Sequence, residues 1–250
     1  MQFLGLIPAR YGSTRFPGKP LADIGGKSMI RRVFEQSSAF FENVYVATED
    51  ERIKKHVIEF GGKVVMTSAD HRSGTDRCAE AAERITELER TSFDVIVNIQ
   101  GDEPFIQAEQ LKSVCDCFEL GDTEIASLVK KITTMDDLVN PNIPKVILNN
   151  KQEAIYFSRS TIPYIRNVSM DHWLEKHIFY KHIGLYAYRF QTLMKLAKLT
   201  PSSLEIAESL EQIRWIENDF RIKIAITDTE NLSIDTPQDL ERVRKHLENL

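Results

Sequence analysis

The chain has 250 residues, of which 42% are hydrophobic and 28% charged, the composition of an ordinary globular protein with a sizeable core. Its formal net charge of −5 argues against a nucleic-acid partner, which would favour a basic face. The sequence shows neither an apolar run of membrane-spanning length nor the pattern of a secretory signal, so we expect no membrane association. Its cysteine count, three, is odd and sparse, which predicts reduced thiols and a cytoplasmic setting.

The first half of the chain alternates short apolar segments with amphipathic ones, which predicts successive βα units. We predict strands at residues 3–8, 44–48, 63–67 and 94–99, a long loop at 9–27, and helices at 28–40, 49–60, 75–89 and 107–118. This spacing implies a parallel sheet with right-handed crossovers. The β-branched segment 94–99 should be a central strand that is buried on both faces.

The rhythm changes after residue 120. We predict strands at 125–132, 145–148, 154–158 and 184–188, a helix at 202–218, a strand at 222–226 and a last helix that begins with Thr236 as N-cap. The first four of these strands have no long helix between them. The sequence therefore predicts a mostly parallel, Rossmann-like α/β sheet flanked by helices, with an antiparallel elaboration over about 125–190.

Residues 8–20 form a cation- and glycine-bearing loop between the first strand and the first helix. Arg10, Arg15 and Lys19 place three positive charges within ten residues, and Gly12 and Gly18 let the backbone come close to a ligand. Such a loop, beyond the carboxyl end of a strand, suits a triphosphate. Its spacing is neither that of a Walker loop nor that of a dinucleotide fingerprint. A solvated basic loop is the alternative.

Asp102 follows the predicted central strand, so its carboxylate should point into the ligand crevice. Mg²⁺ commonly joins one or two protein carboxylates to substrate phosphates, and Asp102 suits that role. The adjacent Glu103 would project differently. Asp235 precedes a Thr-Pro helix start, where an acid could also serve only the helix dipole.

Several motifs occur in an order that is similar to one known family. They are Ile-Pro-Ala-Arg-x-x-Ser-x-Arg-x-Pro-Gly-Lys-Pro from residue 7, Ser-Gly-Thr-Asp-Arg from 73, Asn-Ile-Gln-Gly-Asp-Glu-Pro from 98, Tyr-Phe-Ser-Arg from 156, Lys-His-Ile-Gly from 181, Leu-Glu-Gln from 210 and Asp-Thr-Pro from 235. In these motifs the chain resembles the sugar-acid cytidylyltransferases, most closely the branch that activates 3-deoxy-manno-octulosonate (Kdo). The resemblance implies a single nucleotidyltransferase domain over residues 1–250 that makes CMP-Kdo and pyrophosphate from CTP and Kdo, for lipopolysaccharide biosynthesis.

The resemblance also implies a nucleotide site. Its residues are Arg10, Ser13, Arg15, Lys19, Ser73, Gly74, Arg77 and Gln100. Lys19 and Arg10 would stabilise charge on the phosphates, and Arg15 would hold the distal phosphates. The Ser73, Gly74 and Arg77 group would surround the cytosine. Asp102 and Asp235 would bind Mg²⁺, which orients and activates the attacking oxygen, and with Arg10 and Lys19 they form the implied catalytic set.

For the sugar acid, the resemblance implies a second set of residues. They are Gln100, Arg159, His182, Tyr186, Glu211 and Gln212. On the residues alone, an arginine suits a carboxylate because it binds it bidentately. A lone histidine beside a strand is more often structural, and a glutamate on an amphipathic helix is more often solvated, so those alternatives stay open.

Two other functions stay open as well. The acceptor could be a sialic-type or amino-substituted octulosonic acid or a sugar phosphate, and the chain could be a non-catalytic nucleotide-binding regulator. The presence of both Asp102 and Asp235 argues against a mere regulator. The resemblance implies a homodimer to which the antiparallel region contributes. Trp173 and Tyr180 in that region suit either an interface or a local core.

Overall fold

The computed structural model describes residues 1–12, 16–119, 121–229 and 233–248, with side chains to Lys245. Its residue contacts divide the chain into two compact units. The first comprises Met1–Leu111, Tyr188–Ala197 and Asn231–Leu250, and the second comprises Lys112–Ala187 and Lys198–Glu230. The chain first passes from the first unit to the second within helix α4 (Ala108–Asp116) and returns within strand β10 (Tyr180–Arg189). It then enters the second unit again for Lys198–Glu230 before its last segment rejoins the first.

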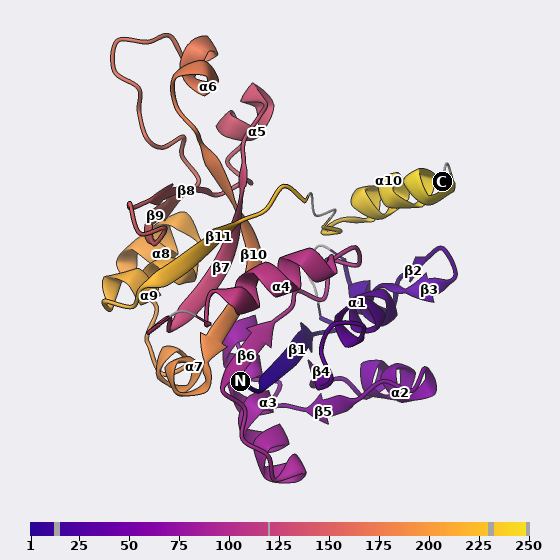
Figure 1. The fold of residues 1–250 in the computed structure, drawn as a ribbon. Helices are drawn as coiled ribbons and strands as arrows, with labels where there is room; N and C mark the ends of the chain where they lie inside the picture. Colours follow the sequence, from indigo (N-terminus) through magenta and orange to yellow (C-terminus); the bar gives the residue numbers. More distant parts are fainter. Residues whose placement is uncertain (13–15, 120, 230–232, 249–250) are drawn as a thin grey trace. The chain divides into compact units, whose positions relative to one another are not determined.

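The first unit is built on four parallel strands in the order β6-β1-β4-β5 (Figure 1). These strands are β1 (Phe3–Ala9), β4 (Val44–Thr48), β5 (Val64–Met66) and β6 (Val95–Asn98). Every residue of β4 and β6 is buried, as the continuous apolar runs predict for strands covered on both faces. The predicted parallel sheet of the first half is therefore confirmed.

Within the described ranges, the α-helices that lie wholly in this unit flank the sheet strands in sequence. They are α1 (Met29–Ser38), α2 (Glu51–Glu59), α3 (Gly74–Glu89), α7 (Phe190–Leu196) and α10 (Pro237–Glu248). The first three begin at side chains that accept a backbone N–H of the first turn, namely those of Ser28, Asp50 and Ser73. Each of these three packs against the strands of the unit.

One prediction for the first unit is wrong in part. Residues 9–27 are not a plain loop, because they contain the short 3₁₀ helix η1 (Lys19–Leu21) and strand β2 (Asp23–Ile24), which pairs with β3 (Lys27–Ser28). Gly25 and Gly26 have positive φ angles and make the tight turn between the strands. Ile24 of this hairpin packs in a buried cluster with Met29, Ile234, Leu240 and Val243, so the hairpin anchors the start of α10.

The second unit combines parallel and antiparallel pairing. Its strands are β7 (Ile125–Lys131), β8 (Lys145–Leu148), β9 (Ala154–Ser158), β11 (Ile222–Ile226) and most of β10. The strand order is β11-β7-β10, β7 and β11 are parallel, and β8 pairs antiparallel with both β9 and β10. The α/β class with an antiparallel elaboration is therefore confirmed.

The helices of the second unit are short. They are α5 (Met135–Val139), α6 (Trp173–Lys176) preceded by the 3₁₀ turn η2 (Met170–His172), α8 (Ser203–Glu208) and α9 (Gln212–Glu217). The prediction of one helix over 202–218 is wrong, because Ser209 adopts a left-handed conformation with φ of 51° and ends α8. Trp173 is only 2% exposed and packs with Ile132, Leu138 and Phe179, so it belongs to a local core.

The helices and the cysteines bear on the expectations about membranes and thiols. None of the helices traced in the described ranges is both long and apolar enough to cross a bilayer. Cys78, Cys115 and Cys117 are free, with none in a disulfide. Burial raises the pKa of Cys115 to about 12 and that of Cys117 to about 11, so both thiols stay protonated near neutral pH.

A buried ion pair holds α8 to α9. Glu205 and Arg214 are each less than 10% exposed, and two guanidinium nitrogens of Arg214 donate to the Glu205 carboxylate at 2.6 and 2.5 Å. The Arg214→Met variant should lose about 3–5 kcal/mol of unfolding free energy in urea titrations, because it leaves the buried Glu205 without its cation. Replacing Glu205 with Met as well should recover part of that loss, and a double variant less stable than the single one would contradict the account.

Candidate active site

A hollow of about 270 Å³ opens in the first unit beyond the carboxyl ends of β1 and β6. It is lined by Pro8, Ala9, Arg10, Lys19, Pro20, His71, Arg72, Ser73, Gly74, Arg77, Gln100, Gly101, Asp102 and Asp235. This is the edge of a parallel sheet at which ligands bind in open α/β folds. The segments that sequence reasoning assigned to phosphates, base and metal therefore line one pocket.

The ammonium group of Lys19 lies between two carboxylates at the floor of this pocket. Lys19 Nζ donates to Asp102 Oδ2 at 2.7 Å and to Asp235 Oδ1 at 3.1 Å. The Lys19 side chain is 15% exposed, against 28% for Asp102 and 41% for Asp235. Because the group is partly withdrawn from water, the attraction within it is stronger than between charges on an open surface.

Local backbone structure brings the three residues together. Gly18 has φ of 72° and starts the η1 turn, which carries Lys19. Gly101 passes so close to β1 that a Cβ atom there would lie 3.1 Å from the carbonyl oxygen of Pro8. Ile234 N donates to the carbonyl oxygen of Asp102 at 3.0 Å, which joins the two acidic segments directly.

The start of α10 is fixed by a reciprocal cap. Thr236 N donates to Asp239 Oδ2 at 2.9 Å, and Asp239 N donates to Thr236 Oγ1 at 3.2 Å. Burial raises the pKa of the Asp239 carboxyl, but the hydrogen bonds from Thr236 and Asp235 outweigh it and hold that pKa below its usual range. Thr236 is thus the N-cap that the sequence predicts, and the cap holds Asp235 at the pocket.

The donor set at the pocket floor fits a hard divalent cation. Two carboxylates already converge on one positive charge, the Lys19 ammonium, which marks a position suited to a cation. Among the described residues no group of three or more histidine, cysteine, aspartate or glutamate side chains could hold a metal. Mg²⁺ suits a site with only two carboxylates, because it commonly takes its remaining ligands from water and substrate phosphates.

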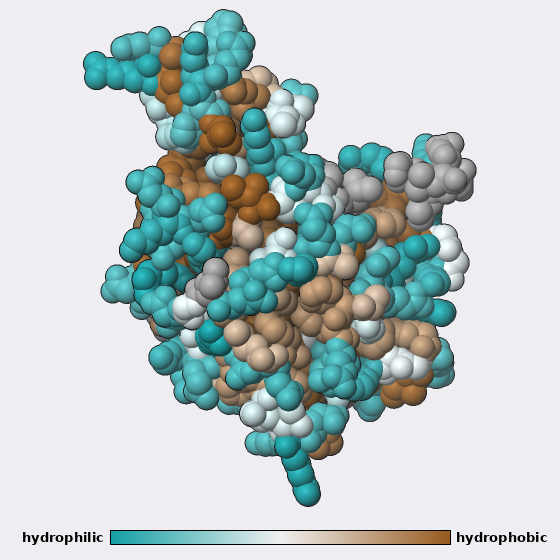
Figure 2. Space-filling model, in the orientation of Figure 1, coloured by the Kyte–Doolittle hydropathy of each residue, from teal (hydrophilic) through white to brown (hydrophobic). Residues whose placement is uncertain are grey.

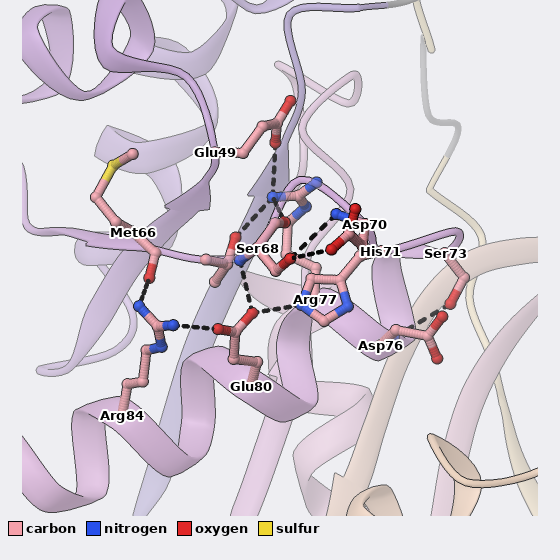
Figure 3. A network of polar contacts seen from close by, with 11 residues as sticks. Glu49, Met66, Ser68, Asp70, His71, Ser73, Asp76, Arg77, Glu80 and Arg84 are labelled. Carbon is pink, nitrogen blue, oxygen red and sulfur yellow. Dashed lines mark hydrogen bonds and ion pairs between the residues drawn. The ribbon is translucent and has the colours of Figure 1, made fainter.

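One wall of the pocket is the segment between β5 and α3, and a polar network behind it holds it in place (Figure 3). The carboxylate of Glu80 accepts from Ser68 N at 2.8 Å and contacts both His71 Nε2 and Arg84. Burial raises the pKa of Glu80, but the Ser68 N–H, the His71 ring and the Arg84 charge outweigh it and lower that pKa overall. The wall is therefore tied to α3 by an ionised carboxylate.

Arg77 supports the same wall from inside. Its side chain is 5% exposed, and Nη1 lies 2.6 Å both from Glu49 Oε2 and from Thr67 Oγ1 (Figure 3). Glu49 follows β4 and Thr67 follows β5, so Arg77 ties α3 to the ends of both strands. Its charge is balanced within the wall by Glu49. Arg10, which directly follows β1, and Lys19 also line the pocket.

The pocket brings together most of the residues assigned to the nucleotide and the metal. They are Arg10, Lys19, Ser73, Gly74, Arg77, Gln100, Asp102 and Asp235. Ser13 and Arg15 lie outside the described residues. Gln100 Nε2 lies 3.4 Å from Asn98 Oδ1. Sequence reasoning gave no role to His71 or Arg72, although both precede Ser73 in a strand-to-helix segment, and that position alone could have indicated the pocket.

The residues assigned to the sugar acid lie in the second unit, apart from Gln100. His182 and Tyr186, both on β10, pack their rings together with centroids 5.2 Å apart, and His182 Nε2 lies 2.9 Å from Ser127 Oγ. Burial lowers the pKa of His182 to about 3, so its imidazole is neutral at physiological pH. Burial also raises the pKa of Tyr186 well above its usual value.

Arg159 follows β9, as the sequence predicts, and its guanidinium is held by backbone carbonyls. Nε, Nη1 and Nη2 donate to the carbonyl oxygens of Glu208, Pro141 and Ser209 at 2.6, 3.1 and 3.2 Å. These contacts fix the plane of the guanidinium.

Glu211 and Gln212 stand at the start of α9. Gln212 is 5% exposed, and within the described part of the chain its Nε2 has no hydrogen-bond partner. A buried donor of this kind is costly unless it is satisfied, which suits a residue that awaits a polar ligand.

Comparisons with known proteins agree with this geometry. A family model described as Cytidylyltransferase matches residues 4–225. The chain is 57% identical to the 3-deoxy-manno-octulosonate cytidylyltransferase of Parabacteroides distasonis, covering 100% of this chain and 99% of that protein. It is 44% identical to the enzyme of the same name from Thermodesulfovibrio yellowstonii, over 97% and 96% of the two chains.

A solved structure is similar over the same length. It is a CMP:2-keto-3-deoxy-manno-octonic acid synthetase complexed with CTP, 39% identical, with a TM-score of 0.89 over 100% of this chain and 99% of that one. A cytidylyltransferase from Leptospira borgpetersenii, 20% identical with a TM-score of 0.64 over 100% and 88%, shares the fold. The chain therefore belongs to the cytidylyltransferase family and, within it, to the 3-deoxy-manno-octulosonate cytidylyltransferases.

Proposed function

We propose that this chain activates the sugar acid Kdo with CTP, giving CMP-Kdo and pyrophosphate. The observation that carries the proposal is the Lys19 ammonium between Asp102 and Asp235, in a pocket whose lining includes Arg10 and the segment from His71 to Gly74. Full-length similarity to enzymes of that name supports the choice of both substrates. Activated Kdo is used in lipopolysaccharide assembly, and we place the enzyme in the cytoplasm.

In the proposed reaction the anomeric hydroxyl of Kdo attacks the α-phosphorus of CTP in line. A new bond forms between that oxygen and phosphorus, the bond to the β-phosphate oxygen breaks, and pyrophosphate leaves. The protein contributes positioning and charge neutralisation rather than a covalent intermediate. Arg10 and Lys19 supply positive charge to the phosphates, and the backbone of Ser73 and Gly74 offers donors and acceptors to the base.

Asp102 and Asp235 would hold Mg²⁺, which when bound would neutralise phosphate charge and orient the attacking oxygen. The two carboxylates now share the Lys19 ammonium. With a divalent cation held by the two carboxylates, Lys19 would be available to pair with the triphosphate. It would then exchange one set of ion pairs for another, which would limit the energetic cost of moving its side chain.

For the acceptor we propose Gln100 in the first unit and five residues in the second. The latter are Arg159, His182, Tyr186, Glu211 and Gln212. Arg159 offers a guanidinium with a fixed plane, which suits a carboxylate, and Gln212 offers a buried amide for a hydroxyl. We further propose that both units act together as one nucleotidyltransferase domain.

We also propose a homodimer to which residues 125–190 contribute. Hydrophobic atoms reach the surface among hydrophilic ones around α5 and α6 (Figure 2), and Val139, Ile155 and Ile178 of the 125–190 segment are about half exposed. A groove of about 550 Å³ runs there between Lys131, Ile147 and Phe179. Apolar surface of this kind is typical of an oligomer interface.

A substrate panel tests the proposed reaction. Purified protein with Mg²⁺ should release pyrophosphate fastest from CTP with Kdo, among CTP, UTP, ATP and GTP combined with Kdo, amino-substituted Kdo, sialic acid and glucose 1-phosphate. A higher rate with another acceptor would correct the substrate. Calorimetric binding of CTP without turnover of any acceptor would instead identify a regulator.

Lys19 is the residue on which turnover should depend most. The Lys19→Ala variant should lose about 10²–10³-fold in kcat, because the charge that faces the phosphates is gone. The variant should stay folded but unfold about 2–4 °C below the wild type, because Asp102 and Asp235 lose the cation that they share in a partly exposed site. Lys55→Ala on α2, whose side chain is 81% exposed, serves as the control. Near-normal pyrophosphate release by Lys19→Ala would show that the assignment is wrong.

The metal assignment predicts an altered Mg²⁺ dependence. Asp102→Asn should need at least about tenfold more Mg²⁺ for half-maximal pyrophosphate release, because a neutral amide is a poorer ligand than a carboxylate. Asp23→Asn, at the exposed position of β2, is the matched control. If chelation of Mg²⁺ leaves the wild-type rate unchanged, or if Asp102→Asn keeps the wild-type Mg²⁺ dependence, the metal site is refuted.

A further inference from the structure

Within the cation-bearing loop of residues 8–20, Tyr11 contacts Gly18 through both its backbone and its ring. Its carbonyl oxygen accepts from Gly18 N at 3.0 Å, and a Cβ atom at Gly18 would lie only 3.2 Å from Cζ and Oη of the ring. The ring thus packs against the backbone immediately before Lys19, while Arg10 precedes Tyr11 in sequence. Arg10 and Lys19 line the pocket. The placement of two phosphate-facing cations therefore depends on where this ring lies.

Arg52 covers the Tyr11 ring from outside. Its Cζ atom lies 3.3 Å from the ring centroid, well within the reach of a cation–π contact. The guanidinium is held in plane by Asp50, since Nε donates to Oδ1 at 2.9 Å and Nη2 donates to Oδ2 at 2.6 Å. A bidentate pair of this kind orients the guanidinium face as well as its charge.

Asp50 is itself anchored at the end of a buried strand. It caps α2 by accepting from Arg52 N at 2.9 Å, and its own N–H donates to Oγ1 of Thr48, the last residue of β4, at 3.2 Å. The Asp50 side chain is 15% exposed. The contacts therefore form a chain from the β4 strand through Asp50 and Arg52 to Tyr11.

The charge of Arg52 is unfavourable at the start of α2 unless another group stabilises it. A cation in the first turn of a helix lies against the positive end of the helix dipole. The Arg52 side chain is 60% exposed and could turn into solvent, yet its guanidinium carbon lies over the Tyr11 ring. The cap of α2 requires only the side chain of Asp50. The cap therefore does not account for the contact between Arg52 and the Tyr11 ring.

We propose that Arg52 is a positioning residue for nucleotide binding, which clamps Tyr11 so that Arg10 and Lys19 face the triphosphate. This inference rests on the proposed function, because it takes CTP as the ligand. Arg52 and Tyr11 touch neither substrate in this account. Their effect reaches the phosphates through the backbone that carries Arg10 and Lys19.

The test combines calorimetric CTP binding with steady-state kinetics on full-length variants. Arg52→Met keeps the length of the side chain but removes its charge and planar face. It should raise both the dissociation constant and the KM of CTP about three- to tenfold, the range of one cation–π contact, while the KM of Kdo stays unchanged. The thermal unfolding temperature should fall by only about 2–4 °C, because the contacts of Arg52 lie at a partly exposed position. Lys55→Met, at an exposed position of the same helix, should leave all four values at the wild-type level.

Tyr11 variants separate a clamp from a general structural role. Tyr11→Leu should weaken CTP binding as much as Arg52→Met, and the double variant should be no weaker than either single variant, because both remove one contact. Tyr11→Phe keeps the ring and should bind CTP within about twofold of the wild type.

Two results would overturn the clamp: an Arg52→Met variant that binds CTP as Lys55→Met does, or additive losses in the double variant. Failure of the proposed function has a different signature. In that case the wild-type chain binds CTP without turning it over, and the calorimetric comparison of the variants still decides whether Arg52 positions the loop.

Discussion

The site depends on one shared charge, the ammonium of Lys19 between the carboxylates of Asp102 and Asp235. Two carboxylates that converge in a partly buried pocket repel each other unless a cation lies between them. Lys19 supplies that cation here, at 2.7 and 3.1 Å. The same arrangement holds three segments far apart in the sequence at one point. In the proposed reaction Asp102 and Asp235 would hold the divalent cation, and Lys19 would pair with the triphosphate.

The wall of the pocket between β5 and α3 is held by ion pairs whose charges balance one another. Arg77 is neutralised by Glu49, and His71 and Arg84 are paired with Glu80, so the wall segment is rigid without adding a large net field. Arg10 and Lys19 near β1, together with Arg72 of the wall, are further cations that line the pocket. A chain with a net charge of −5 can in this way bind an anionic substrate through a small local cluster.

Much of the fold follows from patterns within single segments. Continuous apolar runs predict β4 and β6, and Ser28 and Thr236 mark helix starts that the structure confirms. The break at Ser209 could not be predicted, because serine has no strong preference for the left-handed conformation and the capping box at Ser202 suggests an uninterrupted helix. The sequence is compatible with Trp173 either at an interface or in a local core. Only its tertiary packing with Phe179 shows that it belongs to a local core.

A site residue can be predicted where a local sequence motif indicates its position. It cannot be predicted where its position depends on contacts between segments that are distant in sequence. Asp102 follows a buried strand and so points into the crevice, whereas Asp235 needs the contact between Ile234 and the Asp102 backbone to come near. The ion pair of Lys19 joins residues distant in sequence, and no local signal announces it. The clamp of Arg52 on Tyr11 is of the same kind, because an arginine in the first turn of a helix resembles any solvated residue.

A crystal structure with CTP and Mn²⁺ would test the central claim most directly, because the anomalous signal of Mn²⁺ locates the metal independently of the protein atoms. The account predicts a peak within coordination distance of the carboxylates of Asp102 and Asp235, with Lys19 Nζ moved from them to a phosphate oxygen. A structure in which Lys19 still bridges the two carboxylates, while the metal and triphosphate bind elsewhere, would contradict it.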